Sequence, residues 1–177
     1  ILCATKSGPF GVVEMNKKVE QILSKKELIK TGKEFYNNQL IMITKNDYQL
    51  EIHNGDIGIV REQEGKLQFF LEDKSNKKVE DKTNKKGYRS FPVAYLEKWE
   101  TAYAMTIHKS QGSEFPQVVI CLPENTDNKI LSKELLYTAI TRSSNQVFLI
   151  SDEEVLKACA EISTQKASGI QKRLQRN

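Results

Sequence analysis

The 177-residue sequence lacks the G-x-x-x-x-G-K-[ST] pattern, whose loop holds the phosphates of a bound nucleotide in P-loop enzymes. Its nearest approach is Gly32-Lys33, which has neither the earlier glycine nor the following hydroxyl. We therefore expect that the chain cannot hydrolyse a nucleotide by itself. A stand-alone nucleotide hydrolase is disfavoured, and hydrolysis of added ATP by this chain would revive it.

The chain also has few cysteines and no apolar run near the roughly 20 residues that a membrane helix requires. Cys3, Cys121 and Cys159 are far apart, form no C-x-x-C pair and have no nearby histidine. An odd number at such spacing predicts neither a disulfide framework nor a zinc site. We expect buried thiols in a protein of a reducing cytoplasm, with no bound metal and no membrane partner.

Basic residues exceed acidic ones only slightly, with a formal net charge of +4. They gather toward the end of the chain, where Glu161 is outnumbered by Lys157, Lys166, Lys172, Arg173 and Arg176. Such a balance allows polyanion binding, although a solvated surface is the commoner explanation. The start, Ile1 to Gly8, has neither a basic region nor an initiating Met, so we expect a fragment of a longer chain.

Helical and strand-like patterns alternate at the two ends of the chain. Ile1 to Ala4 predicts a strand, Gly8 to Gly11 a turn, and Val12 to Leu23 an amphipathic helix. After Trp99 the pattern predicts a helix, a buried strand, a helix capped by Ser132, a second strand and a closing helix, over 102–111, 117–122, 133–142, 146–150 and 152–162. Helices alternating with buried strands predict an α/β fold with a parallel sheet.

The middle of the chain, from Gln39 to Leu96, has a different pattern. Short β-type runs bounded by turn residues predict a small barrel, with strands over 40–44, 56–61, 67–71 and 88–92. Asn54-Gly55 and Glu64-Gly65 are turn signals. Asp73 to Gly87 is almost without apolar residues and predicts a mobile, solvated loop. The β-rich segment is therefore expected to be inserted into the α/β domain.

The segment Thr106-Ile-His-Lys-Ser-Gln-Gly-Ser-Glu-Phe115 packs polar residues between apolar runs. Gly112 would let the backbone approach a ligand closely, and Glu114 could accept from a ribose hydroxyl. Donors to phosphate or sugar oxygens are available on Thr106, His108, Lys109, Gln111 and Ser113. An amphipathic helix with a polar exposed end explains this composition equally well.

A second segment, Leu136-Tyr-Thr-Ala-Ile-Thr-Arg142, follows the predicted cap. Helical spacing places Thr138, Thr141 and Arg142 on one face. The stripe expected to face the core is Leu136, Ala139 and Ile140. An arginine at such a helix end can reach a γ-phosphate held by a neighbouring domain, as arginine fingers do. On spacing alone, a surface arginine near a helix C-terminus is the commoner explanation.

Together the two segments resemble motifs V and VI of superfamily 1 helicases, and the similarity is closest to the RecD family, the alpha subunits of bacterial exodeoxyribonuclease V, and to RecD-like helicases. Pif1-like helicases usually lack Ser-Glu after Gln-Gly, and UvrD-like enzymes usually have Ala-Lys-Gly instead of Ser-Gln-Gly. Further similar segments extend the resemblance over nearly the whole chain: Gly8 to Val12 with Asn16, Met42 to Asp47, and Asn54 to Ile59.

The resemblance implies a second RecA-like domain of the P-loop NTPase type, called 2A, over 1–36 and 98–177. An SH3-like barrel, called 2B, would interrupt it over 37–97. It implies that Arg142 is catalytic and contacts the nucleotide together with Gly112 and Glu114. Residues facing single-stranded DNA would be Thr106, His108, Lys109 and Ser113, and residues coupling DNA to nucleotide would be Gln111, Thr138 and Thr141.

The family also implies cofactors and partners. In the full-length protein ATP and Mg²⁺ would be held mainly by the first RecA-like domain, so this chain would carry half a site. The expected activity is 5′ to 3′ helicase movement in double-strand-break repair, with single-stranded DNA and the beta and gamma subunits as partners. The triplets Glu72-Asp-Lys74 and Glu80-Asp-Lys82 imitate part of a metal nuclease motif. We attribute them to chance, and the family places the nuclease in the beta subunit.

An alternative function of another class remains open, in which the barrel docks a partner subunit or a peptide. An exposed aromatic groove involving Tyr88, Phe91 or Tyr95 would favour that alternative. A face lined by lysine and arginine and continuous with His108 and Lys109 would favour DNA binding instead.

Overall fold

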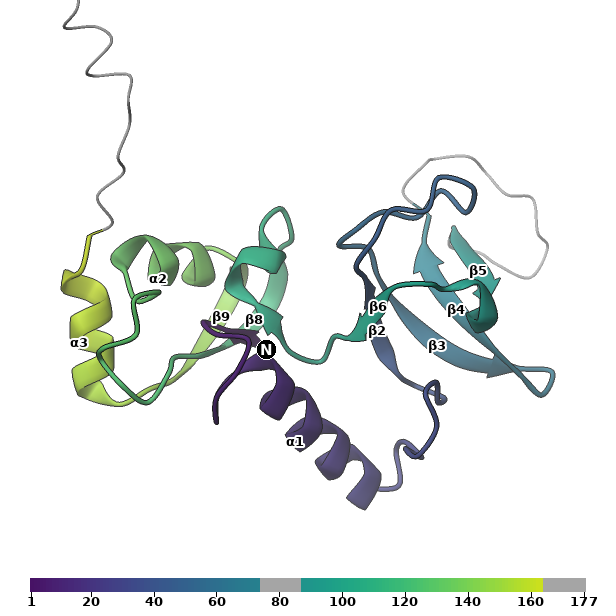
Figure 1. Cartoon of the computed structure of the whole chain (residues 1–177), viewed down its shortest axis with the longest axis horizontal. Helices are drawn as coiled ribbons and strands as arrows, with labels where there is room; N and C mark the ends of the chain where they lie inside the picture. The colour runs from purple at the N-terminus through teal and green to yellow at the C-terminus, as the bar shows by residue number, and fades with distance from the viewer. Residues whose placement is uncertain (74–86, 164–177) are drawn as a thin grey trace, which may run out of the picture. The chain divides into compact units, whose positions relative to one another are not determined.

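The computed structural model describes residues 1–73 and 87–163. Most of the predicted loop 73–87, the triplet Glu80 to Lys82 and the basic tail from Lys166 onward therefore lie outside the described residues. The chain divides into two compact units (Figure 1). We call Val12–Met105 the β-rich unit, and Ile1–Gly11 with the residues from Thr106 onward the α/β unit.

The α/β unit contains a sheet with the strand order β7-β1-β8-β9. Its elements in chain order are β1 (Leu2–Cys3), β7 (Met105–Thr106), the 3₁₀ helix η2 (Ile107–Ser110), β8 (Phe115–Cys121), α2 (Lys133–Ile140), β9 (Ser143–Ile150) and α3 (Glu153–Glu161). β1 and β9 both run parallel to β8. This arrangement confirms the predicted α/β class with a parallel sheet.

The helix α2 begins where the sequence predicts it. The Ser132 hydroxyl accepts a hydrogen bond from the Leu135 N–H at 3.2 Å, as a helix N-cap should. The predicted core stripe is partly wrong: Ala139 is fully buried, but Ile140 is 46% exposed and Leu135 is buried in its place. Because an eight-residue helix has only about two turns, its buried stripe is narrow and consists of Leu135 and Ala139.

The prediction that both main strands are buried holds for β8 but is wrong for β9. Val118, Ile120 and Cys121 of β8 are buried, whereas every residue of β9 is half-buried or exposed. Among the described residues β9 pairs with β8 alone, so its other edge has no strand beside it. An apolar sequence is therefore not sufficient for burial at the edge of this sheet.

The predicted helix over 102–111 is also wrong. Met105–Thr106 forms the strand β7, and a 3₁₀ helix follows over Ile107–Ser110. The main chain of Ala104 is bonded on both its N–H and its C=O to the side chain of Asn16, from the far end of the β-rich unit. These bonds replace the i to i−4 bonds that an α-helix would need there.

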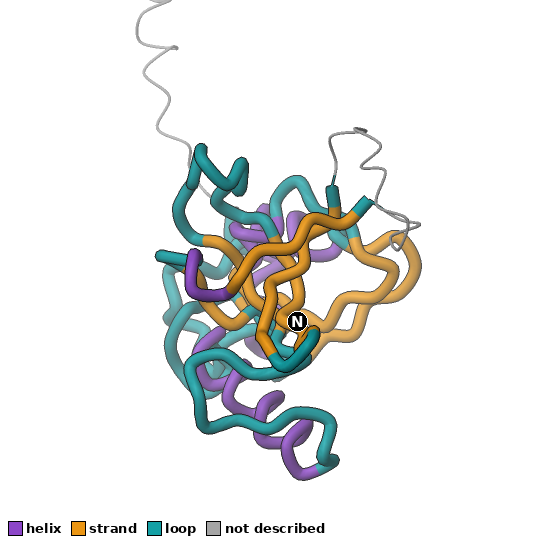
Figure 2. The backbone as a smooth tube through the Cα atoms, turned by 90° about the vertical axis from the view of Figure 1, so that its right-hand side faces the viewer, coloured by secondary structure: helices purple, strands orange, loops and turns teal. Residues whose placement is uncertain are grey.

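The β-rich unit opens with α1 (Val12–Lys25), which lies over the predicted range and extends it by two residues. An antiparallel five-stranded sheet follows, in the order β5-β4-β3-β2-β6. The strands of the chain are orange in Figure 2. Its strands are β2 (Leu40–Ile43), β3 (Ile57–Gln63), β4 (Lys66–Glu72), β5 (Tyr88–Pro92) and β6 (Trp99–Thr101), with the 3₁₀ helix η1 at Val93–Tyr95. The unit is longer than the predicted insertion 37–97, whose boundaries stay a prediction.

An apolar core lies among the strands of this unit. Its buried members are Ile41, Ile43, Ile52, Val60, Phe69, Leu71 and Leu96. The turn signals of the sequence are confirmed, because Glu64 and Gly65 both adopt positive φ between β3 and β4. Gly58 is required for a different reason: a Cβ there would overlap the Phe70 carbonyl and the Phe69 ring. Packing therefore requires glycine at position 58, and backbone conformation favours glycine at position 65.

Candidate functional site

The segment 106–115 forms a capped 3₁₀ turn whose polar side chains lie outward. The Thr106 hydroxyl accepts from the Lys109 N–H at 3.3 Å, and this bond caps η2. Ile107 and Ser110 are fully buried, and the Ser110 hydroxyl donates to the Ile107 carbonyl at 2.7 Å. His108, Lys109 and Gln111 are exposed as a result. Two buried anchors therefore hold the turn while the side chains of His108, Lys109 and Gln111 lie at the surface.

Gly112 follows this turn with φ +87°. A Cβ at this position would have no heavy atom within 4 Å, so backbone conformation and not crowding favours glycine. The Ser113 N–H then returns to the Ser110 carbonyl at 3.0 Å. The chain thus reverses tightly just before Glu114, which is exposed at the start of β8.

Arg142 is the residue that joins the two polar segments. Its Nε donates to the Thr138 carbonyl at 3.1 Å, and one terminal nitrogen donates to the Ser113 carbonyl at 3.1 Å. The other terminal nitrogen donates to the Thr141 hydroxyl at 3.3 Å. A guanidinium carries five N–H donors, so donors remain for an acceptor on a ligand. The predicted common face of Thr138, Thr141 and Arg142 is therefore present, with Ser113 added to it.

A pocket of about 370 Å³ lies beside this link, between η2, α2 and the loop before α2. It brings the predicted residues His108, Gln111 and Thr138 together, and it adds Lys129 and Glu134. Thr106, Lys109 and Glu114 do not line it. Sequence reasoning missed Lys129 because the stretch from Pro123 to Leu131 has no periodicity and no motif.

The three cysteines are buried and unbridged, as the sequence predicts. Cys3 and Cys121 are register partners on the parallel strands β1 and β8, and a hydrogen bond between their side chains together with burial raises the pKa of the Cys3 thiol. Burial also raises the pKa of the Cys159 thiol, which donates to the Ser132 carbonyl at 3.2 Å. The thiols of Cys3 and Cys159 therefore stay protonated at neutral pH and act as small apolar side chains.

Within 1–73 and 87–163, no cluster of three or more His, Cys, Asp or Glu side chains could hold a metal ion. In the same ranges no helix is long and apolar enough to cross a bilayer.

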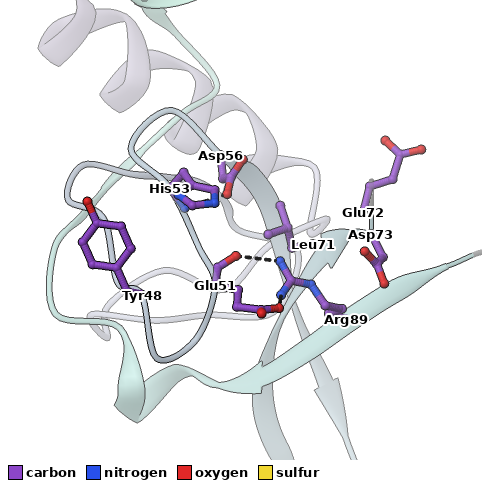
Figure 3. A pocket seen from close by; sticks show the side chains of 8 residues that line it. All are labelled: Tyr48, Glu51, His53, Asp56, Leu71, Glu72, Asp73 and Arg89. Atoms are coloured by element: carbon purple, nitrogen blue, oxygen red, sulfur yellow. Dashed lines mark hydrogen bonds and ion pairs between the residues drawn. The ribbon is translucent and has the colours of Figure 1, made fainter. Parts of the chain in front are cut away.

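A pocket of the β-rich unit, of about 550 Å³, has a different electrostatic character (Figure 3). Its carboxylates outnumber the guanidinium of Arg89, and they belong to Glu51, Asp56, Glu72 and Asp73. Arg89 points into the turn 47–52, where it donates to the main-chain oxygens of Leu50 and Glu51. A pocket with this charge does not suit DNA phosphates.

Exposed tyrosines lie in the same unit. Tyr48 at the pocket rim is 79% exposed, and Tyr88 and Tyr95 are 42% and 59% exposed. Phe91 instead packs against the core, with the Arg89 guanidinium 5.5 Å from its ring centroid. Two of the three aromatic residues named for a docking groove are therefore available at the surface.

Comparison with known proteins places both polar segments in one family domain. Residues 101–150 match the UvrD-like helicase C-terminal domain. The chain is 33% identical to RecBCD enzyme subunit RecD of Mycolicibacterium smegmatis over 98% of its own length and 29% of that protein. It is 40% identical to the same subunit of Buchnera aphidicola from Acyrthosiphon pisum, over 88% of this chain and 25% of that protein.

The chain is also similar to other helicases over part of their length. The ATP-dependent RecD2 DNA helicase of Deinococcus radiodurans is 31% identical over 84% of this chain and 19% of that protein. Among solved structures, a Bacteroides Pif1 helicase in complex with ADP-AlF3 and ssDNA covers 90% of this chain and 42% of its own, with 19% identity and a TM-score of 0.47. Since the similarity to RecD proteins runs over nearly its whole length, the chain belongs to the RecD-like helicase family, and it spans less than a third of those curated relatives.

Proposed function

We propose that this chain is the C-terminal motor segment of an ATP-dependent superfamily 1 DNA helicase that moves 5′ to 3′ along single-stranded DNA. In this proposal the α/β unit belongs to the second RecA-like domain, 2A, and the segment 37–97 is the SH3-like barrel 2B. The parent protein is the alpha subunit of exodeoxyribonuclease V, working with beta and gamma subunits in double-strand-break repair in the bacterial cytoplasm. Relatives named as RecD subunits and as a RecD2 DNA helicase support this assignment.

The bond between Arg142 and the Ser113 carbonyl is the observation that carries the proposal. It ties the segment proposed as motif VI to the segment proposed as motif V, one residue after Gly112. A guanidinium held on one side by carbonyl oxygens keeps donors for the γ-phosphate of ATP, which the first RecA-like domain would hold with Mg²⁺. There it would stabilise charge that develops in phosphoryl transfer, as arginine fingers do.

The same bond supplies a route from nucleotide to DNA. Thr106, His108, Lys109 and Ser113 lie on or beside the capped turn, where they would contact the sugar-phosphate backbone of one strand. Contacts of this kind follow a strand without reading its sequence. When Arg142 engages the γ-phosphate, its pull on the Ser113 carbonyl would shift this turn along the strand. Gln111 and Thr138, in the adjoining pocket, are placed to transmit the shift.

Substitution of Arg142 in the longer helicase tests this function. We expect Arg142→Ala to lower DNA-stimulated ATP turnover on the order of 10³-fold while single-stranded DNA affinity stays within about three-fold. Arg142→Lys should not restore turnover, because an ammonium group cannot bond the Thr138 and Ser113 carbonyls in the same planar arrangement. Arg61→Ala is the matched control, since Arg61 donates to Asn38 in the β-rich unit. Unchanged turnover in Arg142→Ala would overturn the assignment.

A second function, docking of a partner protein through the β-rich unit, is favoured by the acid-lined pocket and the exposed tyrosines beside it. It is compatible with the first, because a motor subunit needs a surface for its partners. Glu51→Lys with Tyr48→Ala should weaken binding to purified beta and gamma subunits at least ten-fold and leave DNA-stimulated ATP turnover unchanged. Tyr137→Ala, at an exposed tyrosine of the α/β unit, is the control. Equal subunit affinity in both variants would remove this second function.

A further inference from the structure

Asn16 is a buried polar residue of α1 that the proposed mechanism does not use. Its side chain is 8% exposed and is fully bonded to one stretch of main chain. The Nδ2 group donates to the Ala104 carbonyl at 2.9 Å and to the Thr101 carbonyl at 3.1 Å. The Oδ1 atom accepts from the Ala104 N–H at 2.9 Å. One carboxamide therefore fixes the segment from Thr101 to Ala104.

The two donated hydrogen bonds and one accepted hydrogen bond at position 16 favour asparagine over aspartate and glutamine. The pair of bonds to the N–H and C=O of Ala104 is what a neighbouring β-strand would otherwise supply. Aspartate has the same shape but no donor, and it would turn a negative charge toward two carbonyl oxygens. Glutamine is longer by one methylene, so its carboxamide could not keep the positions of these bonds to the buried segment that holds Ala102 and Ala104 unless the backbone shifted.

The bonds from Asn16 to Thr101 and Ala104, which we call the Asn16 clasp, lie close in sequence to the polar turn. Asn16 lies four residues after Val12, where the β-rich unit begins, and Ala104 lies one residue before Met105, where it ends. Thr106 follows directly, in extended conformation with ψ 149°, and its hydroxyl caps η2. The anchor at Ala104 therefore lies two residues before the residue that caps the turn, so it fixes the chain immediately before the turn begins.

We propose that Asn16 is a positioning residue that holds the entry to the motif V turn, and through it the Ser113 carbonyl that Arg142 contacts. The local part of this inference concerns the conformation of 104–113 and stands by itself. The effect on catalysis rests on the proposed function. Displacing a catalytic segment by about 1 Å can lower turnover as much as 10²-fold, so a distant clasp of this kind can control the rate.

Asn16→Asp tests the local part in this chain, with Asn125→Asp in an exposed loop as the control for added charge. We expect amide ¹H–¹⁵N shifts at Thr106, Lys109 and Ser113 in Asn16→Asp and none there in Asn125→Asp. Asn16→Ser, which keeps one donor and one acceptor, should give smaller shifts at the same amides, and it serves alone if the aspartate variant does not fold. Shifts restricted to α1 and 101–104 would overturn the inference.

The catalytic part is measured in the longer helicase, at a temperature where circular dichroism shows each variant fully folded. Asn16→Asp should lower DNA-stimulated kcat at least ten-fold with KM for ATP within two-fold, whereas a purely structural residue would leave kcat per folded molecule unchanged. That unchanged kcat would overturn the positioning role. Absence of ATP turnover in the unaltered helicase would instead count against the proposed function, and the amide shifts would still decide the local role of Asn16.

Discussion

Phe69 and Phe148 stand near the middle of strands of similar length in the two units, and their surroundings are opposite. Phe69 on β4 is fully buried, between register partners Val60 on β3 and Phe91 on β5. Phe148 on β9 is 46% exposed and has one described register partner, Val119 on β8. The sequences around both residues are equally apolar, so the difference comes from how many strands and layers cover each side chain.

The two units therefore differ in what they contribute: the β-rich unit has an enclosed core, and the α/β unit has the candidate functional site. The β-rich unit closes its own core, while the α/β unit carries the turn, Arg142 and the polar pocket on a sheet whose edge strand is uncovered within 1–73 and 87–163. Strands of parallel sheets are usually covered on both faces. We therefore expect substitutions in the β-rich unit to change the free energy of unfolding, and matched substitutions on β9 to change association instead.

The largest effect should follow from Phe69→Ala. Removing a fully buried phenyl ring from the core is expected to lower the free energy of unfolding by about 3–5 kcal/mol. Urea unfolding followed by fluorescence of Trp99, which stacks on Phe35 at 4.5 Å in the same unit, measures it. Phe148→Ala is the control and should change the circular dichroism transition by less than about 0.5 kcal/mol. Equal losses in both variants would erase the contrast between the units.

A smaller effect on the free energy of unfolding should appear at alkaline pH, and it should come from the β-rich unit only. Burial and the bond to Glu20 raise the pKa of Tyr36 above its ordinary value of 10. The folded chain then holds a proton that the unfolded chain releases, so stability is complete below pH 10 and falls as pH rises above it. The slope should approach about 1.4 kcal/mol per pH unit. Urea titrations at pH 9 to 11 should lose this slope in Tyr36→Phe and keep it in Tyr137→Phe, at the 70% exposed tyrosine.

Local patterns in the sequence were sufficient for most elements of the fold. Alternating apolar residues with turn signals at Asn54-Gly55 and Glu64-Gly65 predicted β2 to β5 to within two residues. Helical spacing with Ser132 as a cap did the same for the start of α2. Such signals succeed because turns, caps and periodicity act over a few neighbouring residues.

Long-range contacts account for the errors. Ala102 to Gln111 has helical composition, but the side chain of Asn16, 88 residues earlier in the chain, bonds the main-chain N–H and C=O of Ala104. In the candidate site, the motif residues could be named from the sequence, whereas the bond from Arg142 to Ser113 spans 29 residues and depends on how α2 packs. The exposure of β9 likewise depends on which strands lie beside it, and this cannot be predicted from the residues of β9 alone.

The N-cap of α2 offers a test within the α/β unit at about 1 kcal/mol. Ser132→Ala removes the hydroxyl that accepts from the Leu135 N–H, and caps of this kind contribute about 0.5–2 kcal/mol. Hydrogen exchange at the Leu135 and Leu136 amides should accelerate accordingly, because local opening of α2 becomes easier. Ser144→Ala, on an exposed position of β9, should leave these amides unchanged. Faster hydrogen exchange at the Trp99 amide of the β-rich unit as well would mean that the two units unfold together.

The smallest change in stability, and the most direct probe of the uncovered strand, should come from Phe148→Lys. An apolar edge with free backbone groups is a template for pairing with another chain, and lysine on such an edge opposes it. We expect the unaltered chain to self-associate as its concentration rises, and Phe148→Lys to remain monomeric in sedimentation velocity with an unfolding free energy within about 0.5 kcal/mol of the unaltered value. Ile22→Lys, on a 54% exposed position of α1, should associate like the unaltered chain. If both lysine variants associate equally, β9 is not the contact, and its exposed residues are as inert as those of any solvated strand.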